Sequence, residues 1–217
     1  MLQTPERRAR PLAAAHVEPA TGRSGGVEGN ARLTAASAAV LLALLATEGV
    51  TILFLRPLLS VHVFVGMMLI PPVALKLAST GWRFLRYYAG SRPYVLKGPP
   101  RLLLRLLVAP GVVLSTLAVL GTGVALLAVG PGDGIVLGLH KASFVVWLVA
   151  MGAHVLAYLW RVPRLAGADW RRASRLGSAW ARVGLVSGAL VAGAVLAALT
   201  LHFAQPWHDW VRLRHDG

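Results

Sequence analysis

The chain contains no cysteine among its 217 residues, and this absence excludes disulfides, iron–sulfur clusters and thiolate metal sites. Any redox chemistry must therefore use other ligands. Charge is also scarce, because Asp, Glu, Lys and Arg make up only 14% of the residues, against roughly 25% in soluble domains. With 56% hydrophobic residues and a mean hydropathy of +0.64, the composition is that of a membrane protein.

The first 31 residues lack the apolar stretch of a cleavable signal peptide. They are polar and rich in Ala, Gly, Pro and Arg, so we predict a disordered cytoplasmic tail over residues 1–31. Residues 32–205 hold every long apolar segment, and residues 206–217 are expected to form a short extracytoplasmic tail. No soluble domain is predicted.

Five segments are long and apolar enough to cross a bilayer. A hydrocarbon core about 30 Å thick needs about 20 apolar residues in a helix that rises about 1.5 Å per residue. The segments that satisfy this length are Leu33–Leu55, Pro57–Thr80, Leu106–Gly130, Gly134–Trp160 and Val183–Ala204. We therefore predict an all-α fold, a polytopic transmembrane helix bundle of five spans in the cell membrane.

Basic residues determine the expected orientation. Five precede the first span, six lie between the second and third spans, and six lie between the fourth and fifth. The positive-inside rule makes these segments cytoplasmic, which places the N-terminus in the cytoplasm and the C-terminus outside. The net charge of +14 could indicate a nucleic-acid partner, but topology and anionic lipid headgroups explain its concentration beside the span ends. No nucleic-acid partner is therefore expected.

Two histidines lie inside the fourth span, in the related segments LGLH (137–140) and MGAH (151–154). Fourteen helical residues complete nearly four turns, so His140 and His154 share a face and lie roughly 21 Å apart along the axis. Polar groups at this depth are costly and usually functional, although a lone histidine can also hydrogen-bond between helices. Two histidines on one face favour a functional role.

The second span should run in the same direction as the fourth, so the depth of its residues can be counted from the flanking charges. His62 and His140 lie six and seven residues after the charged residue at the outer end of their spans, which places the two imidazoles level with each other. His154 lies seven residues before the arginine at the inner end of its span. The residue level with it on the second span is Lys76, fourteen residues after His62.

Imidazoles within membranes serve as proton relays, metal ligands or axial ligands of haem iron. A relay needs carboxylates, but Glu48 is the only one in the spans, and a metal-ion site needs clustered ligands, but His140 and His154 are a leaflet apart. Two haems, one per leaflet, fit this separation. Glu48 and His202 lie toward the outer surface, where either could take up protons released by a quinol or simply be an interfacial polar residue. His202 is also an alternative to His62 as a ligand of the outer haem.

These intervals resemble the bacterial membrane cytochrome b proteins, in which two haems b are stacked across the bilayer between histidines thirteen or fourteen residues apart on parallel helices. The resemblance covers about residues 34–160 and rests on His62, His140 and His154. It implies a four-helix haem-binding core and makes His62 and His140 the ligands of the outer haem. It also implies an electron-transfer subunit rather than a catalyst on its own, with a quinone pool and a peripheral or soluble oxidoreductase subunit as partners.

Lys76 departs from the histidine pattern of these cytochromes. A neutral lysine amine can ligate iron, and burial favours the neutral form, so Lys76 could be the second ligand of the inner haem. The alternatives are that Lys76 extends its ammonium to the inner headgroups or pairs with a haem propionate; the inner haem is then absent, or His154 has another ligand. Two alternatives stay open for the whole chain: a mono-haem cytochrome that uses His62 and His140, and a haem-free transporter or assembly factor.

Overall fold

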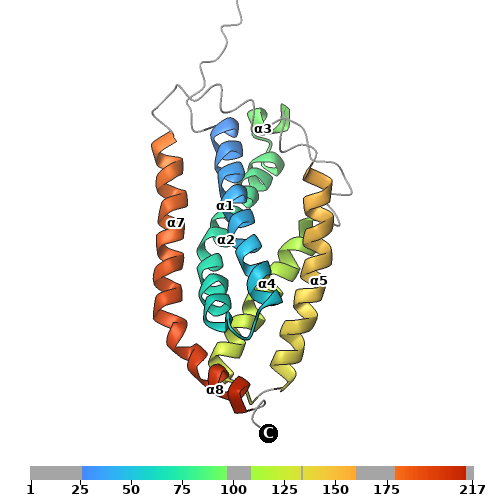
Figure 1. Ribbon diagram of the computed structural model, residues 1–217. Helices are drawn as coiled ribbons and strands as arrows, with labels where there is room; N and C mark the ends of the chain where they lie inside the picture. Colours follow the sequence, from blue (N-terminus) through green and yellow to red (C-terminus); the bar gives the residue numbers. More distant parts are fainter. Residues whose placement is uncertain (1–25, 97–108, 133, 160–178, 214–217) are drawn as a thin grey trace, which may run out of the picture.

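The chain folds as an all-α bundle, shown in Figure 1 as a computed structural model that describes residues 26–96, 109–132, 134–159 and 179–213. The helices are α1 (Val27–Leu53), α2 (Leu59–Tyr88), α3 (Arg92–Leu96), α4 (Ala109–Val129), α5 (Gly134–Leu159), α7 (Ala179–Thr200), the 3-10 helix η3 (Leu201–Ala204) and α8 (Gln205–Leu213). Within these ranges there is no strand. Five of the helical segments are long and apolar enough to cross a membrane, so the predicted fold class is confirmed.

Helix α2 is the central element of the bundle. It packs along α1 on one side and α7 on another, and it also touches α4. Helix α4 in turn packs along α5, which lies at the opposite edge of the bundle from α7 (Figure 1). The short helices mark the two ends: α3 lies at one end, and α8 lies across the other.

Helix α1 begins earlier than the sequence predicts. It starts at Val27, so residues 27–31, expected to belong to a disordered tail, form its first turns. Two contacts hold these turns: Arg32 forms an ion pair of 3.2 Å with Glu28, one turn away, and Asn30 Nδ2 donates a 2.9 Å hydrogen bond to the main-chain oxygen of Ser79 on α2. Residues 1–25 lie outside the described residues.

Helix α2 stays helical through Pro71 and Pro72 and extends to Tyr88, beyond the predicted end of its span. Pro72 has no N–H, so it cannot bond to the carbonyl of Met68 one turn earlier. The backbone of α7 approaches that carbonyl at Gly193, where an added Cβ would overlap the Met68 oxygen and lie 3.2 Å from the Met68 carbonyl carbon. A glycine at this position lets the two helices pack closely, as small residues do in membrane bundles.

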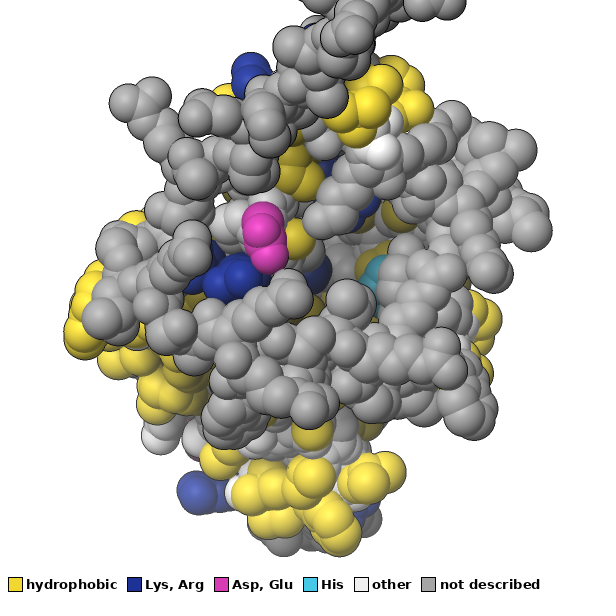
Figure 2. Space-filling view, turned by 90° about the horizontal axis from the view of Figure 1, so that it is seen from above, with side chains coloured by type: hydrophobic (Ala, Val, Ile, Leu, Met, Phe, Trp, Pro, Cys, Tyr) yellow, Lys and Arg dark blue, Asp and Glu magenta, His cyan; other side chains and the backbone are white. Residues whose placement is uncertain are grey.

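The outer surface of the bundle is covered with large hydrophobic side chains. The exposed ones on α5 and α7 include Val145, Val146, Leu148, Val149, Leu156, Val183, Leu185, Val191, Val195 and Leu199. Figure 2, which looks down on the α3 end, shows hydrophobic side chains at the outer edge, while cationic side chains and an acidic one gather nearer the middle. So much exposed apolar surface is typical of a protein that faces lipid rather than water.

The C-terminal segment folds back over one end of the bundle. Residues 206–217 were expected to be a short tail, but α8 occupies Gln205–Leu213 and follows directly on η3. Trp207 is only 8% exposed, and its Nε1 donates a 3.3 Å hydrogen bond to the main-chain oxygen of Leu126 on α4. His208 Nε2 lies 2.7 Å from Ser60 Oγ on α2. These contacts hold α8 against the ends of α2 and α4.

Candidate cofactor-binding cavity

A large cavity lies among α1, α2, α4 and α5, and α8 borders it at one end. Its volume of about 820 Å³ falls in the range of roughly 300–1,000 Å³ that is usual for cofactor and small-molecule sites. Most of its lining is apolar, contributed by Leu, Val, Met, Phe and Trp side chains. Residues 180–200 of α7 do not line this cavity, which lies among the other four long helices.

The cavity brings together all four residues that the sequence singles out. His62 and Lys76 line it from α2, and His140 and His154 line it from α5. His62 and His140 lie near the starts of α2 and α5, toward the α8 end. Lys76 and His154 lie farther along the same two helices, toward the α3 end.

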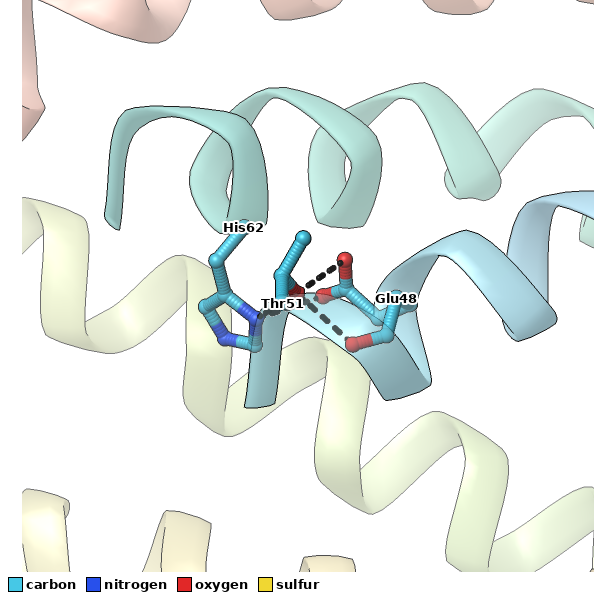
Figure 3. Close-up of polar contacts among 3 residues, drawn as sticks. All are labelled: Glu48, Thr51 and His62. Atoms are coloured by element: carbon cyan, nitrogen blue, oxygen red, sulfur yellow. Dashed lines mark hydrogen bonds and ion pairs between the residues drawn. The ribbon is translucent and has the colours of Figure 1, made fainter. Parts of the chain in front are cut away.

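The imidazole of His62 is held from α1 by two side chains (Figure 3). Its Nδ1 lies 2.9 Å from Glu48 Oε1 and 3.1 Å from Thr51 Oγ1. The Thr51 hydroxyl donates to the main-chain oxygen of Glu48, one turn earlier on α1, at 2.7 Å, and this bond fixes the orientation of the hydroxyl. A carboxylate oxygen accepts, so the contact with Glu48 calls for a proton on Nδ1; in a neutral ring the lone pair is then on Nε2, on the side of the ring away from Glu48.

The imidazole of His140 is oriented in the same way from α4, but by a neutral group. Its Nδ1 lies 3.1 Å from Thr122 Oγ1, and that hydroxyl donates to the main-chain oxygen of Ala118 at 2.7 Å. If the Thr122 oxygen is the acceptor of this contact, the proton is on Nδ1 and the lone pair of the neutral ring is on Nε2. Gly123 makes room for the ring, since a Cβ there would lie 3.3 Å from His140 Cε1.

Lys76 has a hydrogen-bond partner outside the cavity lining. Its Nζ donates a 2.6 Å hydrogen bond to the main-chain oxygen of Thr34 on α1. Ser79, one turn later on α2, accepts a hydrogen bond of 3.1 Å from the Thr34 hydroxyl. Lys76 thus takes part in a polar contact between α1 and α2 as well as lining the cavity.

An aromatic stretch separates the two histidine levels on α5. Phe144, Trp147 and Met151 line the cavity at helical intervals between His140 and His154. The rings of Phe144 and Trp147 are stacked with their centroids 6.2 Å apart. Trp147 Nε1 donates a 3.1 Å hydrogen bond to Thr116 Oγ1 on α4, which fixes the indole in place.

Two cations line the cavity at the α8 end. Arg56 precedes α2, and Lys141 directly follows His140 on α5. Trp207 and Trp210 of α8 line the same end. His202, considered above as a rival to His62, lies on η3, is exposed and does not line the cavity.

The histidines that line the cavity are spread along it rather than clustered. Among the residues that the structure describes, no group of three or more His, Cys, Asp or Glu side chains could hold a metal ion. Haem iron needs only one or two protein ligands, because the porphyrin supplies four nitrogens.

Comparison of the chain with family models, with curated proteins and with solved structures finds no significant match to any of them.

Sequence reasoning missed several parts of this site. It noted Glu48 as the only carboxylate of the spans but did not place it against His62, and it did not identify Thr122 or the α8 tryptophans. The signal for Glu48 was its isolation, because a single acidic residue in a membrane span usually has a partner. The span sequences carry no comparable signal for Thr122, since threonine is common in membrane helices.

Proposed function

We propose that this chain is a membrane b-type cytochrome that moves electrons across the bilayer through haem held in the cavity, with its N-terminus in the cytoplasm. The observation that carries the proposal is the arrangement of His62 and His140. The two imidazoles line one cavity from two different helices, and hydrogen bonds at Nδ1 leave the Nε2 lone pair of each as the ligating atom. Metal-ligating histidines are held in this way in proteins.

The residues around the histidines fit a haem in other respects. Gly123 leaves space beside the His140 ring, and the largely apolar walls suit a porphyrin. Arg56 and Lys141 at the α8 end supply positive charge for the propionates. When bound, haem would supply one-electron redox chemistry; the imidazoles of His62 and His140 would hold it, and the surrounding residues would set its orientation and exclude water.

The second proposed haem site is at His154, toward the α3 end of the same cavity. Lys76 lines the same cavity from α2 and is the candidate partner of His154, either as a second iron ligand or as the cation that meets a propionate. Its hydrogen bond to the Thr34 carbonyl fits both roles, because an ammonium keeps two further N–H donors for a propionate, while a neutral amine that donates here keeps its lone pair for iron. The cofactors are therefore two haems b, or one if only His62 and His140 bind.

The partners follow from the proposed electron path. Electrons crossing the bilayer need a donor and an acceptor at its two faces, and by resemblance to membrane cytochromes b we propose a quinone pool and a peripheral or soluble oxidoreductase subunit. The many exposed Leu and Val side chains contact lipid. In this role the chain is an electron-transfer subunit rather than a catalyst on its own.

A reduced-minus-oxidised visible spectrum of the purified protein, with haem quantified per chain, tests the proposal. Two haems per chain support the di-haem form and one supports the mono-haem form. Protein without haem, purified from cells with ample haem, overturns the proposal in favour of a haem-free transporter or assembly factor. Replacing Lys76 with Met then tests its role as a ligand: an unchanged haem count and spectrum remove Lys76 from the ligand set.

A further inference from the structure

Glu48 is an isolated acidic side chain at membrane depth. It is the only Asp or Glu within the five predicted spans, and its side chain is only 13% exposed. A carboxylate in such surroundings is costly unless it is paired, and residues of this kind are usually functional. Its partners are the Nδ1 of His62, whose side chain is 22% exposed, and the hydroxyl of Thr51, 3.2 Å from Glu48 Oε2.

The two histidines near the α8 end therefore have chemically different supports. His62 donates its Nδ1 proton to a carboxylate, whereas His140 donates to the neutral hydroxyl of Thr122. A carboxylate draws the Nδ1 proton more strongly than a hydroxyl and makes the ring a stronger base at Nε2. Thr51 already places a hydroxyl 3.1 Å from the same Nδ1, so what Glu48 adds at His62 is a negative charge.

We propose that Glu48 is a positioning residue that lowers the reduction potential of the haem bound by His62; the inference rests on the proposed function. Ferric haem carries one more positive charge than ferrous haem. A negative carboxylate behind His62, and the more basic imidazole it creates, therefore stabilise the oxidised form relative to the reduced form. Hydrogen bonding to an axial ligand is one of the means by which proteins tune haem potentials.

The test is a spectroelectrochemical titration of the full-length protein and its Glu48→Gln variant in the same detergent. Glutamine keeps the size and an acceptor oxygen but removes the charge. We expect the variant to keep its haem and the midpoint potential of one component to shift to more positive values. The electron paramagnetic resonance spectrum of the oxidised haem should change as well, because the ligand field of His62 weakens.

Glu28→Gln is the matched control, since it removes the same charge from the same helix at an exposed position near the other end of α1. It should leave the potential unchanged. A haem-loaded Glu48→Gln variant with the wild-type potential and spectrum overturns the inference, and so does an equal shift in Glu28→Gln, which would reflect overall charge.

Glu48→Asp keeps the proposal testable if the glutamine variant does not retain haem. Aspartate preserves the charge but withdraws it from His62, so the potential should lie above that of the wild type, and a value equal to the wild type overturns the inference. The proposed function fails separately, when the wild-type protein binds no haem. If the wild type binds haem and the Glu48 variant has the same midpoint potential, only the role of Glu48 is rejected.

Discussion

Replacing Gly193 with alanine should destabilise the bundle by pushing α7 away from α2. The added Cβ would overlap the Met68 carbonyl oxygen and would lie 3.2 Å and 3.3 Å from the carbonyl carbon and Cα of the same residue. These are backbone atoms of a helix, which cannot rotate aside as the end of a side chain can. The helices must therefore shift, and the close packing along this long contact is lost.

The magnitude follows from a comparison with Gly188→Ala, five residues earlier on α7, where an added Cβ meets no atom within 4 Å. Both variants gain helix propensity worth roughly 0.5–1 kcal/mol. Only Gly193→Ala suffers the overlap, and overpacking of this kind costs roughly 1–3 kcal/mol. For a chain of this size each kcal/mol moves the Tm by roughly 2–4 °C, so Gly193→Ala should melt about 2–12 °C below Gly188→Ala.

Thermal unfolding of both variants in one detergent, followed by tryptophan fluorescence, measures this difference. Because residues 180–200 of α7 do not line the cavity, the haem content of the folded Gly193→Ala protein should equal that of the wild type. A Tm of Gly193→Ala equal to or above that of Gly188→Ala would refute the close approach of α7 to the Met68 carbonyl.

Two further changes test the supports of the cavity. Thr122→Val removes the hydroxyl that orients His140. Because hydrogen bonds to metal-ligating histidines are typically worth roughly 10–100-fold in metal affinity, the variant should lose haem to a competing apoprotein more readily by about that factor. Haem retention equal to that of the wild type would contradict the role assigned to Thr122. Trp207→Ala should lower stability by about 3–5 kcal/mol, as for other buried tryptophans, and expose the cavity at the α8 end. Limited proteolysis should then cut α8 faster than in the wild type, and an unchanged cutting rate would show that Trp207 does not hold α8 in place.

The spans could be predicted from the sequence because their length and hydropathy follow directly from the thickness of a bilayer. The predicted segment Gly134–Trp160, for example, closely matches α5 (Gly134–Leu159). Depth along a span could also be counted, because charged residues mark the ends. Counting of this kind led from His140 and His154 to His62 and Lys76 on the second span; all four line one cavity, although their roles as ligands stay predictions.

The sideways arrangement of the helices could not be predicted. Lipid is as apolar as a protein interior, so hydrophobic periodicity does not mark which face of a membrane helix is buried. The contact of Glu48 with His62 and the approach of Gly193 to Met68 both depend on that arrangement. The fold of α8 over the bundle depends on Trp207 finding a site on α4, which the short polar segment alone does not indicate.

The most direct test of the account is the haem content and reduced spectrum of His62→Ala and His140→Ala, with His202→Ala as the control. His202 lies at the same end of the chain's bundle but is exposed and outside the cavity. We predict that the first two variants lose the same spectral component and that the control keeps the wild-type haem content. Wild-type spectra in His62→Ala and His140→Ala, or loss of the component in His202→Ala, would contradict the claim that His62 and His140 hold one haem between them.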